Sequence, residues 1–248
     1  MQRERKVLLS VEDLHVRYGA FEAVKGVSFT LGQGEIFGIV GESGSGKSTI
    51  AKALMGLEKP SDGKIWFAPC EDGRRVPQRS GVPGYVQMIF QDATGSLNPR
   101  MTVRQTLDET LKVWRTSDAD PERLLSMVGL SSAVLDQYPR EMSGGQCQRV
   151  SVARALACSP SVLVADEPVS ALDVSVQARV LNLLRDLRAK LGLSIILIAH
   201  DLAVVKNVCD RVSVMERGAF VDSGETDEVF GNPKSDYTRR LLAAVPRL

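Results

Sequence analysis

The sequence feature that most limits the possible folds is a glycine-rich segment placed directly after an apolar run. Ile36–Val40 is continuously apolar, as in a strand that is buried on both faces of a parallel sheet. Gly41–Ser48 follows and matches the pattern G-x-x-x-x-G-K-[ST]. In this setting the glycines let backbone N–H groups converge on phosphate oxygens, and the next helix adds the positive end of its dipole. The segment predicts a phosphate-binding loop rather than an ordinary glycine-rich turn.

Positions in this loop have separate expected roles. Lys47 would bring a positive charge to the β- and γ-phosphates, and Ser48 would hold Mg²⁺. A dinucleotide-binding fingerprint is excluded, because Thr49 stands where that pattern needs a third glycine. The predicted nucleotide contacts of the loop are Gly41, Ser43, Gly44, Ser45, Gly46, Lys47, Ser48 and Thr49.

A second acidic signal follows another apolar run. Val162–Ala165 reads as a buried strand and ends in Asp166 and Glu167. Adjacent side chains of an extended strand point opposite ways, so the two carboxylates can differ in role. Asp166 would reach Mg²⁺ through its water shell, and Glu167 would act as a general base on the attacking water. A helix cap or a turn is the alternative for such a strand end, and the phosphate loop favours the catalytic interpretation.

Periodicity predicts an α/β fold. Ile195–Ala199 is a third apolar run, and helical spacing extends from Val176 to Leu191 before it. Strand, helix and strand in this order indicate a parallel sheet with ligands at the carboxyl ends of its strands. From Ala93 to about Ser159 the pattern is helical, which predicts a helical insert.

The two ends of the chain have other patterns. The first 34 residues alternate as in antiparallel strands, with two predicted faces formed by Leu14, Val16 and Tyr18 and by Val27, Phe29 and Leu31. Val212, Val214 and Phe220 alternate around a turn at Arg217-Gly218. A helix-like tail containing Tyr237, Leu241 and Leu242 follows.

Composition excludes several other classes. The chain is 44% hydrophobic and 25% charged, which is typical of a soluble globular protein and not of a disordered one. The 31 Lys and Arg residues nearly balance the 30 Asp and Glu residues, so nucleic acid is not an expected partner. Met1–Lys6 is polar and no apolar run approaches the roughly 18 residues of a membrane span. We therefore expect neither a secretion signal nor a membrane-spanning segment.

The cysteine spacing predicts reduced thiols in a cytosolic protein. No C-x-x-C pair occurs, so neither a zinc site nor a disulfide framework is indicated. The four cysteines are Cys70, Cys147, Cys158 and Cys209.

The segment Glu141–Gln146 makes the interpretation specific. It resembles the signature motif of the ATP-binding cassette (ABC) ATPases, with Met142 where the family usually has leucine. Ser143, Gly144, Gly145 and Gln146 also have a physical reason to bind an anion, because a hydroxyl and bare amides stand at the start of a predicted helix. A serine-capped helix is the simpler alternative and holds in either case. In the family, the signature of one subunit closes on the ATP of its partner.

Four further positions resemble family sites in the expected order. Tyr18 resembles the aromatic that stacks on adenine, and Gln91 the glutamine that senses Mg²⁺ and couples to the transport subunit. Asp173 lies in a segment that resembles the loop that crosses the dimer interface, and His200 resembles the switch histidine near the γ-phosphate. The alternatives are a core aromatic for Tyr18, surface polar residues for Gln91 and Asp173, and a capping residue for His200. Next to the signature, Cys147 is either a reactive or a passive thiol.

The resemblance implies a P-loop NTPase core with a mainly parallel sheet, an antiparallel β subdomain and an inserted α-helical subdomain. We expect one ABC ATPase domain over residues 1–248. Its parts would be the β layer with a RecA-like core at 7–91 and 160–230, the helical subdomain with the signature at 92–159, and a helical tail at 231–248.

Short segments point to a subgroup of this family. They resemble segments in the ATPases of importers for oligopeptides, dipeptides, nickel and opines. The segments are Gln91-Asp92, Ser96–Arg100, Asn232-Pro233, Tyr237-Thr238 and Leu241-Leu242. Many ATPases of that group carry a longer C-terminal extension, whereas this chain ends at Leu248. The short form resembles nickel- or metallophore-type members.

The resemblance implies an ATPase that binds ATP and Mg²⁺ and powers a membrane importer. Its partners would be integral membrane permease subunits, a second ABC ATPase subunit that is identical or related, and indirectly an extracytoplasmic solute-binding protein. We expect the chain at the cytoplasmic face of the cell membrane, as a peripheral subunit. The alternatives are a DNA-repair or translation ATPase, and a soluble assembly such as a phosphonate-cleaving complex. Co-purified chains would distinguish them.

Overall fold

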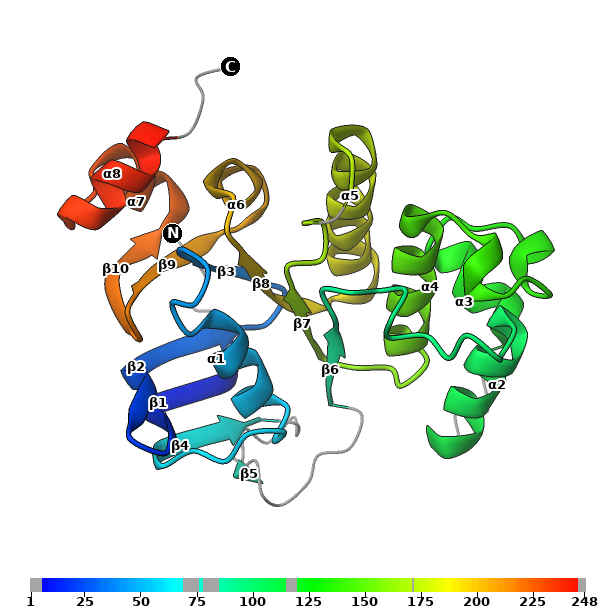
Figure 1. Cartoon of the computed structure of the whole chain (residues 1–248), viewed down its shortest axis with the longest axis horizontal. Coiled ribbons are helices and arrows are strands. Elements are labelled where there is room, and N and C mark those ends of the chain that lie inside the picture. The colour runs from blue at the N-terminus through cyan, green and yellow to red at the C-terminus, as the bar shows by residue number, and fades with distance from the viewer. Residues whose placement is uncertain (1–5, 69–75, 78–84, 115–119, 171, 245–248) are drawn as a thin grey trace. The chain divides into compact units, whose positions relative to one another are not determined.

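The computed structural model describes residues 6–68, 76–77, 85–114, 120–170 and 172–244 (Figure 1). The chain forms two compact units. The first unit consists of Met1–Pro83 and Ser194–Leu248, and the second is Gly84–Leu193. The finer subdomain boundaries drawn from the sequence stay predictions.

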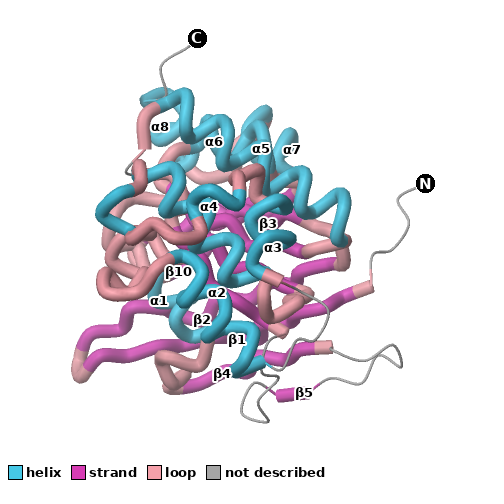
Figure 2. Tube along the Cα trace, turned by 90° about the vertical axis from the view of Figure 1, so that its right-hand side faces the viewer, coloured by secondary structure: helices cyan, strands magenta, loops and turns pink. Residues whose placement is uncertain are grey.

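An antiparallel layer in the first unit begins with two long strands, β1 (Val7–Tyr18) and β2 (Phe21–Gly32). β1 also pairs antiparallel with β4 (Asp62–Phe67), which pairs with β5 (Val76–Pro77), and Figure 2 shows these strands side by side. The predicted face of β2 is confirmed, because its apolar side chains Val27, Phe29 and Leu31 are all buried. Phe29 stacks on Phe37 with ring centroids 5.1 Å apart.

The predicted face of β1 is only partly correct. Leu14 and Val16 are buried, whereas Tyr18 is 43% exposed. The pairing of β1 with β2 shifts register between Val16 and Arg17, so simple alternation stops before the strand ends. Tyr18 is therefore not a core aromatic.

A parallel core fills the rest of the first unit. β3 (Ile36–Val40) lies between β8 (Ser194–Ala199) and β9 (Arg211–Glu216) and is parallel to both. β10 (Ala219–Glu225) returns antiparallel to β9 through the predicted turn. The buried strand before the phosphate loop is confirmed, with all five residues of β3 buried. The helices of this unit are α1 (Lys47–Leu54), α6 (Leu202–Val208), α7 (Thr226–Gly231) and α8 (Asp236–Ala244).

The second unit pairs a short parallel ladder with helices. β6 (Val86–Ile89) is parallel to β7 (Val162–Asp166). The remaining elements are α2 (Val103–Trp114), α3 (Pro121–Met127), the 3₁₀ turns η2 (Ser132–Val134) and η3 (Pro139–Glu141), α4 (Gly144–Leu156) and α5 (Val174–Leu191). The predicted helical stretch is thus confirmed, and within its described residues it contains α2, α3 and α4.

The periodicity of α5 is confirmed except at its end. Val180, Leu184 and Leu187 are buried, but Leu191 is 47% exposed. Leu191 lies in the last turn, directly before the C-cap Gly192, where φ is 67°. A residue at that place extends past the buried face of the helix.

Candidate functional site

The loop after β3 is shaped by two glycines that no other residue could replace. A Cβ on Gly41 would lie 2.1 Å from the carbonyl oxygen of Met215. A Cβ on Gly46 would lie 2.5 Å from the carbonyl oxygen of Ala23, at a φ of 111°. Both contacts are with backbone that cannot move aside cheaply. At these two positions of the predicted phosphate loop, glycine allows neighbouring backbone to approach closely.

Lys47 is buried within this loop. Its side-chain Nζ donates to the carbonyl oxygens of Gly41 and Glu42, each at 2.8 Å, and the residue is only 4% exposed. The loop backbone thus holds the ammonium group in place. A fixed positive charge beside exposed amides is suited to phosphate oxygens.

Two further observations fit a phosphate ligand. The buried Oγ of Ser45 has no hydrogen-bond partner among the described residues. The first turn of α1 contains no acidic residue, so its positive dipole end is not neutralised from within the helix. An anion would satisfy both the orphaned hydroxyl and the helix N-terminus. The residues present therefore fit a nucleotide phosphate chain.

Tyr18 presents an exposed ring at the end of β1, in the same unit as this loop. Its hydroxyl interacts with Glu58 and Thr49. Burial of the hydroxyl, together with Glu58, raises the pKa of Tyr18 above its usual range. An exposed ring held at its polar tip is suited to stacking on a base. Glu58 is a residue that sequence reasoning missed, because it stands in no motif.

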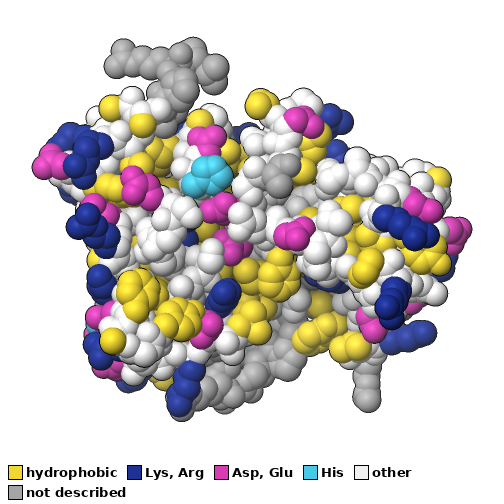
Figure 3. Space-filling model, viewed as in Figure 1, with side chains coloured by type: hydrophobic (Ala, Val, Ile, Leu, Met, Phe, Trp, Pro, Cys, Tyr) yellow, Lys and Arg dark blue, Asp and Glu magenta, His cyan; other side chains and the backbone are white. Residues whose placement is uncertain are grey.

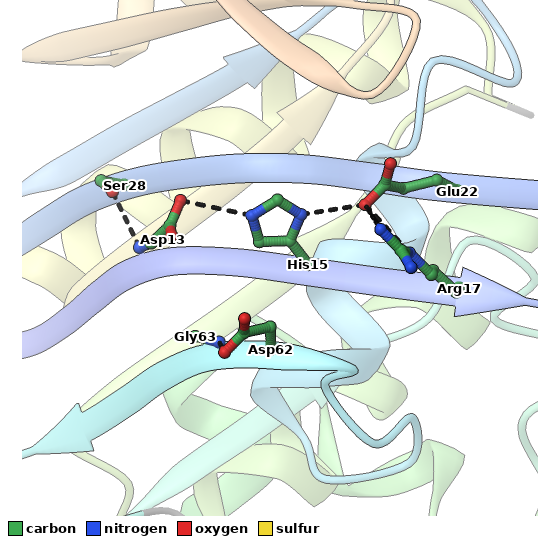
Figure 4. A network of polar contacts seen from close by, with 7 residues as sticks. All are labelled: Asp13, His15, Arg17, Glu22, Ser28, Asp62 and Gly63. Carbon is green, nitrogen blue, oxygen red and sulfur yellow. Dashed lines mark hydrogen bonds and ion pairs between the residues drawn. The ribbon is translucent and has the colours of Figure 1, made fainter.

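The hairpin that carries Tyr18 is crosslinked by a polar network (Figure 4). His15 Nδ1 lies 2.9 Å from Glu22 Oε1, and His15 Nε2 lies 3.3 Å from Asp13 Oδ1. Arg17 donates to the same Glu22 oxygen from Nε at 3.2 Å and from Nη2 at 3.1 Å. Gly26 on β2 permits this approach, since a Cβ there would lie 2.8 Å from Asp13 Oδ1.

This network shifts two pKa values in opposite directions. The hydrogen bond to Glu22 raises the pKa of His15, with a further contribution from Asp13. The hydrogen bond to His15 lowers the pKa of Glu22, and Arg17 adds to this effect. The charged pair is therefore favoured on the hairpin at mildly acidic pH.

His200 follows β8 directly and is exposed. The capping alternative for His200 is wrong, because Asp201 is the N-cap of α6 and accepts a hydrogen bond from the Ala203 N–H at 2.8 Å. His200 precedes this cap and stands at the carboxyl end of a parallel strand. Ligand sites form at such strand ends.

The carboxylates of the second unit differ in setting. Asp166 is the last residue of β7 and is 6% exposed. Glu167 has a φ of 45°, a left-handed conformation that costs a non-glycine residue about 1–3 kcal/mol. Strand alternation predicts both residues on one extended strand, which is wrong for Glu167. The turn after the strand, and not strand alternation, separates the two carboxylates.

Gln91 and Glu167 are brought together by the β6–β7 pairing. Gln91 Nε2 donates to Glu167 Oε2 at 3.2 Å, although the two residues are far apart in sequence. Ser170 fixes the same turn, since its N–H and Oγ both donate to the Glu167 carbonyl oxygen, at 3.2 and 3.1 Å. An amide donor on a strained glutamate is suited to orienting a catalytic carboxylate.

Asp173 acts as a helix cap. Its carboxylate accepts from Ser175 Oγ at 2.7 Å and from the Val176 N–H at 2.9 Å, and these bonds lower its pKa. Gln177 was missed from the sequence, yet its Nε2 donates to the carbonyl oxygens of Val169 and Leu172 at 3.0 and 2.9 Å. Gln177 therefore fixes the loop that leads to Asp173.

The signature segment begins α4 with a capping box. Ser143 Oγ accepts the Gln146 N–H at 3.3 Å, and Gln146 Oε1 accepts the Ser143 N–H at 2.8 Å. Ser143 and Gly144 are exposed. A Cβ on Gly145 would lie 2.6 Å from Val176 Cγ1, so this glycine is also required by the approach of α4 to α5. The serine-cap interpretation is confirmed.

Cys147 is a passive thiol. It is 1% exposed, and burial raises its pKa. Burial likewise raises the pKa of Cys158 to about 11, and Cys209 is a buried free thiol. A raised pKa leaves the thiol protonated at neutral pH and therefore unreactive. Cys70 lies outside the described residues.

The predicted site residues divide between the two units. The phosphate loop, Tyr18 and His200 belong to the first unit, whereas Gln91, Asp166, Glu167, the signature and Asp173 belong to the second. On the face drawn in Figure 3, cationic and anionic side chains are intermixed, in keeping with a formal net charge of +1. Among the described helices, none has both the length and the apolarity to cross a bilayer.

Phosphate loop, acidic strand end and signature together define an ABC ATPase, and comparison with known proteins agrees. The family model for ABC transporters matches residues 24–170. The oligopeptide transport ATP-binding protein OppF of Salmonella typhimurium is 47% identical, over 98% of this chain and 79% of the relative. OppF of Streptococcus pyogenes serotype M1 is 45% identical, over 96% of this chain and 82% of the relative.

Solved structures give the same result. The cbiO1 protein of Clostridium perfringens, part of the ABC transporter complex cbiONQ, is 28% identical with a TM-score of 0.78 over 98% of this chain and 97% of that chain. An ATP-binding cassette of an ABC transporter in its ADP conformation is 25% identical with a TM-score of 0.78 over 96% of this chain and 99% of that one. The chain belongs to the ABC transporter family. It is an ATPase of that family, with the α/β fold that its sequence predicted.

Proposed function

We propose that this chain is the ATP-hydrolysing subunit of an oligopeptide importer. The observation that carries the ATPase part is the phosphate loop, in which the backbone holds a buried lysine beside an orphaned serine hydroxyl. The names of the OppF relatives, at 45–47% identity over nearly the whole chain, support oligopeptides as cargo. They favour peptide transport over nickel transport and over a soluble, non-transport complex.

Each site residue then has a role toward MgATP. Lys47 and the loop amides bind the phosphates, and Tyr18 stacks on adenine. Ser48, Gln91 and Asp166 hold Mg²⁺, directly or through water, since hydroxyl, amide and carboxylate oxygens are suitable ligands for this ion.

The remaining roles concern the chemical step and the second nucleotide contact. Glu167 polarises the attacking water as a general base, and Gln91 orients its carboxylate through the hydrogen bond at 3.2 Å. His200 contacts the γ-phosphate. Ser143 to Gln146 bind the ATP of another subunit, and Asp173 lies at that interface.

The subunit works as part of an assembly. Two ATPase subunits, identical or related, enclose two ATP molecules, and their motion drives integral membrane permease subunits that receive peptide from an extracytoplasmic solute-binding protein. This places the chain peripherally at the cytoplasmic face of the membrane. The exposed signature supports such a dimer, because Ser143 and Gly144 are accessible to a partner.

Affinity purification from detergent-solubilised membranes tests this function. A tagged Glu167→Gln chain held in ATP should retain two hydrophobic permease chains. Reconstituted wild-type complex should hydrolyse ATP faster when a peptide-loaded binding protein is supplied, and nickel should have no such effect. Recovery of soluble enzyme subunits without permeases would contradict the importer, and stimulation by nickel alone would contradict the cargo.

A further inference from the structure

A tyrosine of the C-terminal tail contacts the phosphate loop. Tyr237, in the first turn of α8, accepts a hydrogen bond from the Glu42 N–H at 3.1 Å. Tyr237 is 6% exposed, and its burial raises the pKa of the hydroxyl, which therefore stays protonated at neutral pH. The tail motif that the sequence assigned only to a subgroup thus has a contact within the nucleotide site.

The segment that leads into α8 is held by a buried carboxylate on β10. Asp222 on β10 is 6% exposed, and its Oδ2 accepts the N–H groups of Lys234 at 2.8 Å and Ser235 at 3.2 Å. Ser235 Oγ in turn accepts the Tyr237 N–H at 3.1 Å. This anchoring fixes the position of the tyrosine independently of the loop.

The other side of the contact leads to Lys47. The peptide groups of Glu42 take part in three hydrogen bonds: its N–H donates to Tyr237, while its carbonyl accepts Lys47 Nζ at 2.8 Å and the Ser45 N–H at 3.2 Å. Glu42 therefore links the hydroxyl of Tyr237 to the ammonium group of Lys47 through two hydrogen bonds. Any shift of Glu42 changes the carbonyl that positions the ammonium.

Later residues of α8 face a space that they share with the loop. A cavity of about 380 Å³ lies between them, lined by Glu42, Ser43, Arg217, Tyr237, Arg240 and Leu241 among others. The tyrosine hydroxyl is a point contact, so its removal should loosen the loop without opening a core.

We propose that Tyr237 is a positioning residue for nucleotide binding, holding the Glu42 peptide so that Lys47 and the loop amides are oriented toward the phosphates. This inference rests on the proposed role of Gly41–Ser48 as the phosphate loop. It makes α8 the route by which a displacement of the tail changes ATP affinity.

The test compares Tyr237→Phe with Tyr138→Phe in the full chain. Each change removes one hydroxyl and keeps the ring, and the Tyr138 ring faces the Arg140 guanidinium in the second unit. We expect Tyr237→Phe to raise the KM for ATP about three- to tenfold, as for one neutral hydrogen bond, with kcat within about twofold. Tyr138→Phe should change neither.

Binding of inorganic tripolyphosphate identifies the cause. Tyr237→Phe should weaken tripolyphosphate and ATP by the same factor, because the loop and not the base is affected. An unchanged KM, or a loss confined to kcat, overturns the proposal, and so does a loss for ATP that spares tripolyphosphate. Lys47→Ala is measured alongside. If Lys47→Ala binds MgATP normally, the phosphate-loop assignment itself fails; if it loses binding while Tyr237→Phe resembles the wild type, only the positioning role fails.

Discussion

The phosphate loop and the signature start are both helix N-termini, yet they are built differently. The loop is closed around Lys47, which its own carbonyls hold, and neighbouring backbone leaves no space for a Cβ at Gly41 or Gly46. The signature is open, because its capping box satisfies two groups locally and leaves Ser143 and Gly144 exposed. The first element is organised within its own unit. The second has the accessibility of a surface that meets a partner.

The difference extends to Glu167, the proposed general base. Glu167 is strained and has a polar contact with Gln91, while Lys47 is held by two carbonyls. A residue with a strained backbone is suited to a step in which the site changes during a cycle. We infer that nucleotide binding depends on preformed geometry and hydrolysis on geometry completed by another chain. Variants of each region test this contrast.

The largest effect is expected at Glu167. Glu167→Gln keeps the shape of the side chain and removes the general base, so kcat should fall by roughly 10²–10⁴. Binding of MgATP should stay within about twofold of wild type, since the loop is untouched. Single-turnover hydrolysis and calorimetry measure the two quantities. Turnover near the wild-type rate would show that Glu167 is not the base.

Lys47→Ala tests whether nucleotide binding depends on the preformed phosphate loop. It removes charge-assisted hydrogen bonds of about 1.5–3 kcal/mol each, so MgATP affinity should fall by about 10²-fold. Calorimetry measures this loss, and Lys52→Ala is the matched control, because Lys52 lies in the last turn of the same helix. Equal affinity in wild type and Lys47→Ala would contradict the phosphate-loop assignment.

Much of this arrangement could be predicted from local patterns, and the failures are physical. Ile36–Val40 and the loop after it depend on contiguous residues, so the sequence alone located them. Tyr18 and Glu167 were misplaced because a register shift and a left-handed turn interrupt strand alternation. Gln177 and Tyr237 act through backbone groups of distant residues, and no local pattern reports such contacts.

Mixed dimers test whether the exposed signature of one chain completes the nucleotide site of another. Lys47→Ala and Ser143→Arg chains are each expected to be inactive alone, because every site in either homodimer is damaged. A mixed dimer places both lesions in one site and leaves the other intact, so mixing should restore ATP hydrolysis. Steady-state ATPase assays at constant total protein measure this recovery, with native mass spectrometry counting the mixed dimers. Mixed dimers without recovered activity would contradict independent sites completed in trans.

Tyr18→Ala should have a smaller and selective effect. Loss of a base-stacking ring costs about 1–3 kcal/mol, so ATP affinity should fall by about 5- to 150-fold. Tripolyphosphate affinity should not change, because the ring does not belong to the loop. Calorimetry with both ligands measures the difference, and Phe21→Ala on the neighbouring strand is the matched exposed-ring control. An equal loss for both ligands would show that Tyr18 supports the fold and not the base.

The smallest effect is a pH dependence at the His15 network, which supports the hairpin carrying Tyr18. The pKa of His15 is raised above 6.5, so its contribution to stability is complete below 6.5 and is lost as pH rises through the higher folded value. The pKa of Glu22 is lowered below 4.5, so its contribution is complete above 4.5 and is lost as pH falls through the lower folded value. The pair should therefore stabilise the folded chain most between about pH 4.5 and 6.5.

Titration by NMR tests this effect directly. The His15 ring signal should titrate above pH 6.5 in the wild type, and at a lower pH in Glu22→Gln, which keeps the side-chain shape but removes the negative charge. The difference in unfolding free energy between wild type and His15→Gln should also shrink as pH rises from 6 to 8, since both chains then lack the imidazolium. Equal His15 midpoints in wild type and Glu22→Gln would show that the contact at 2.9 Å does not hold the charged pair. In that case the hairpin would owe its geometry to the pairing of its strands and not to the charged pair.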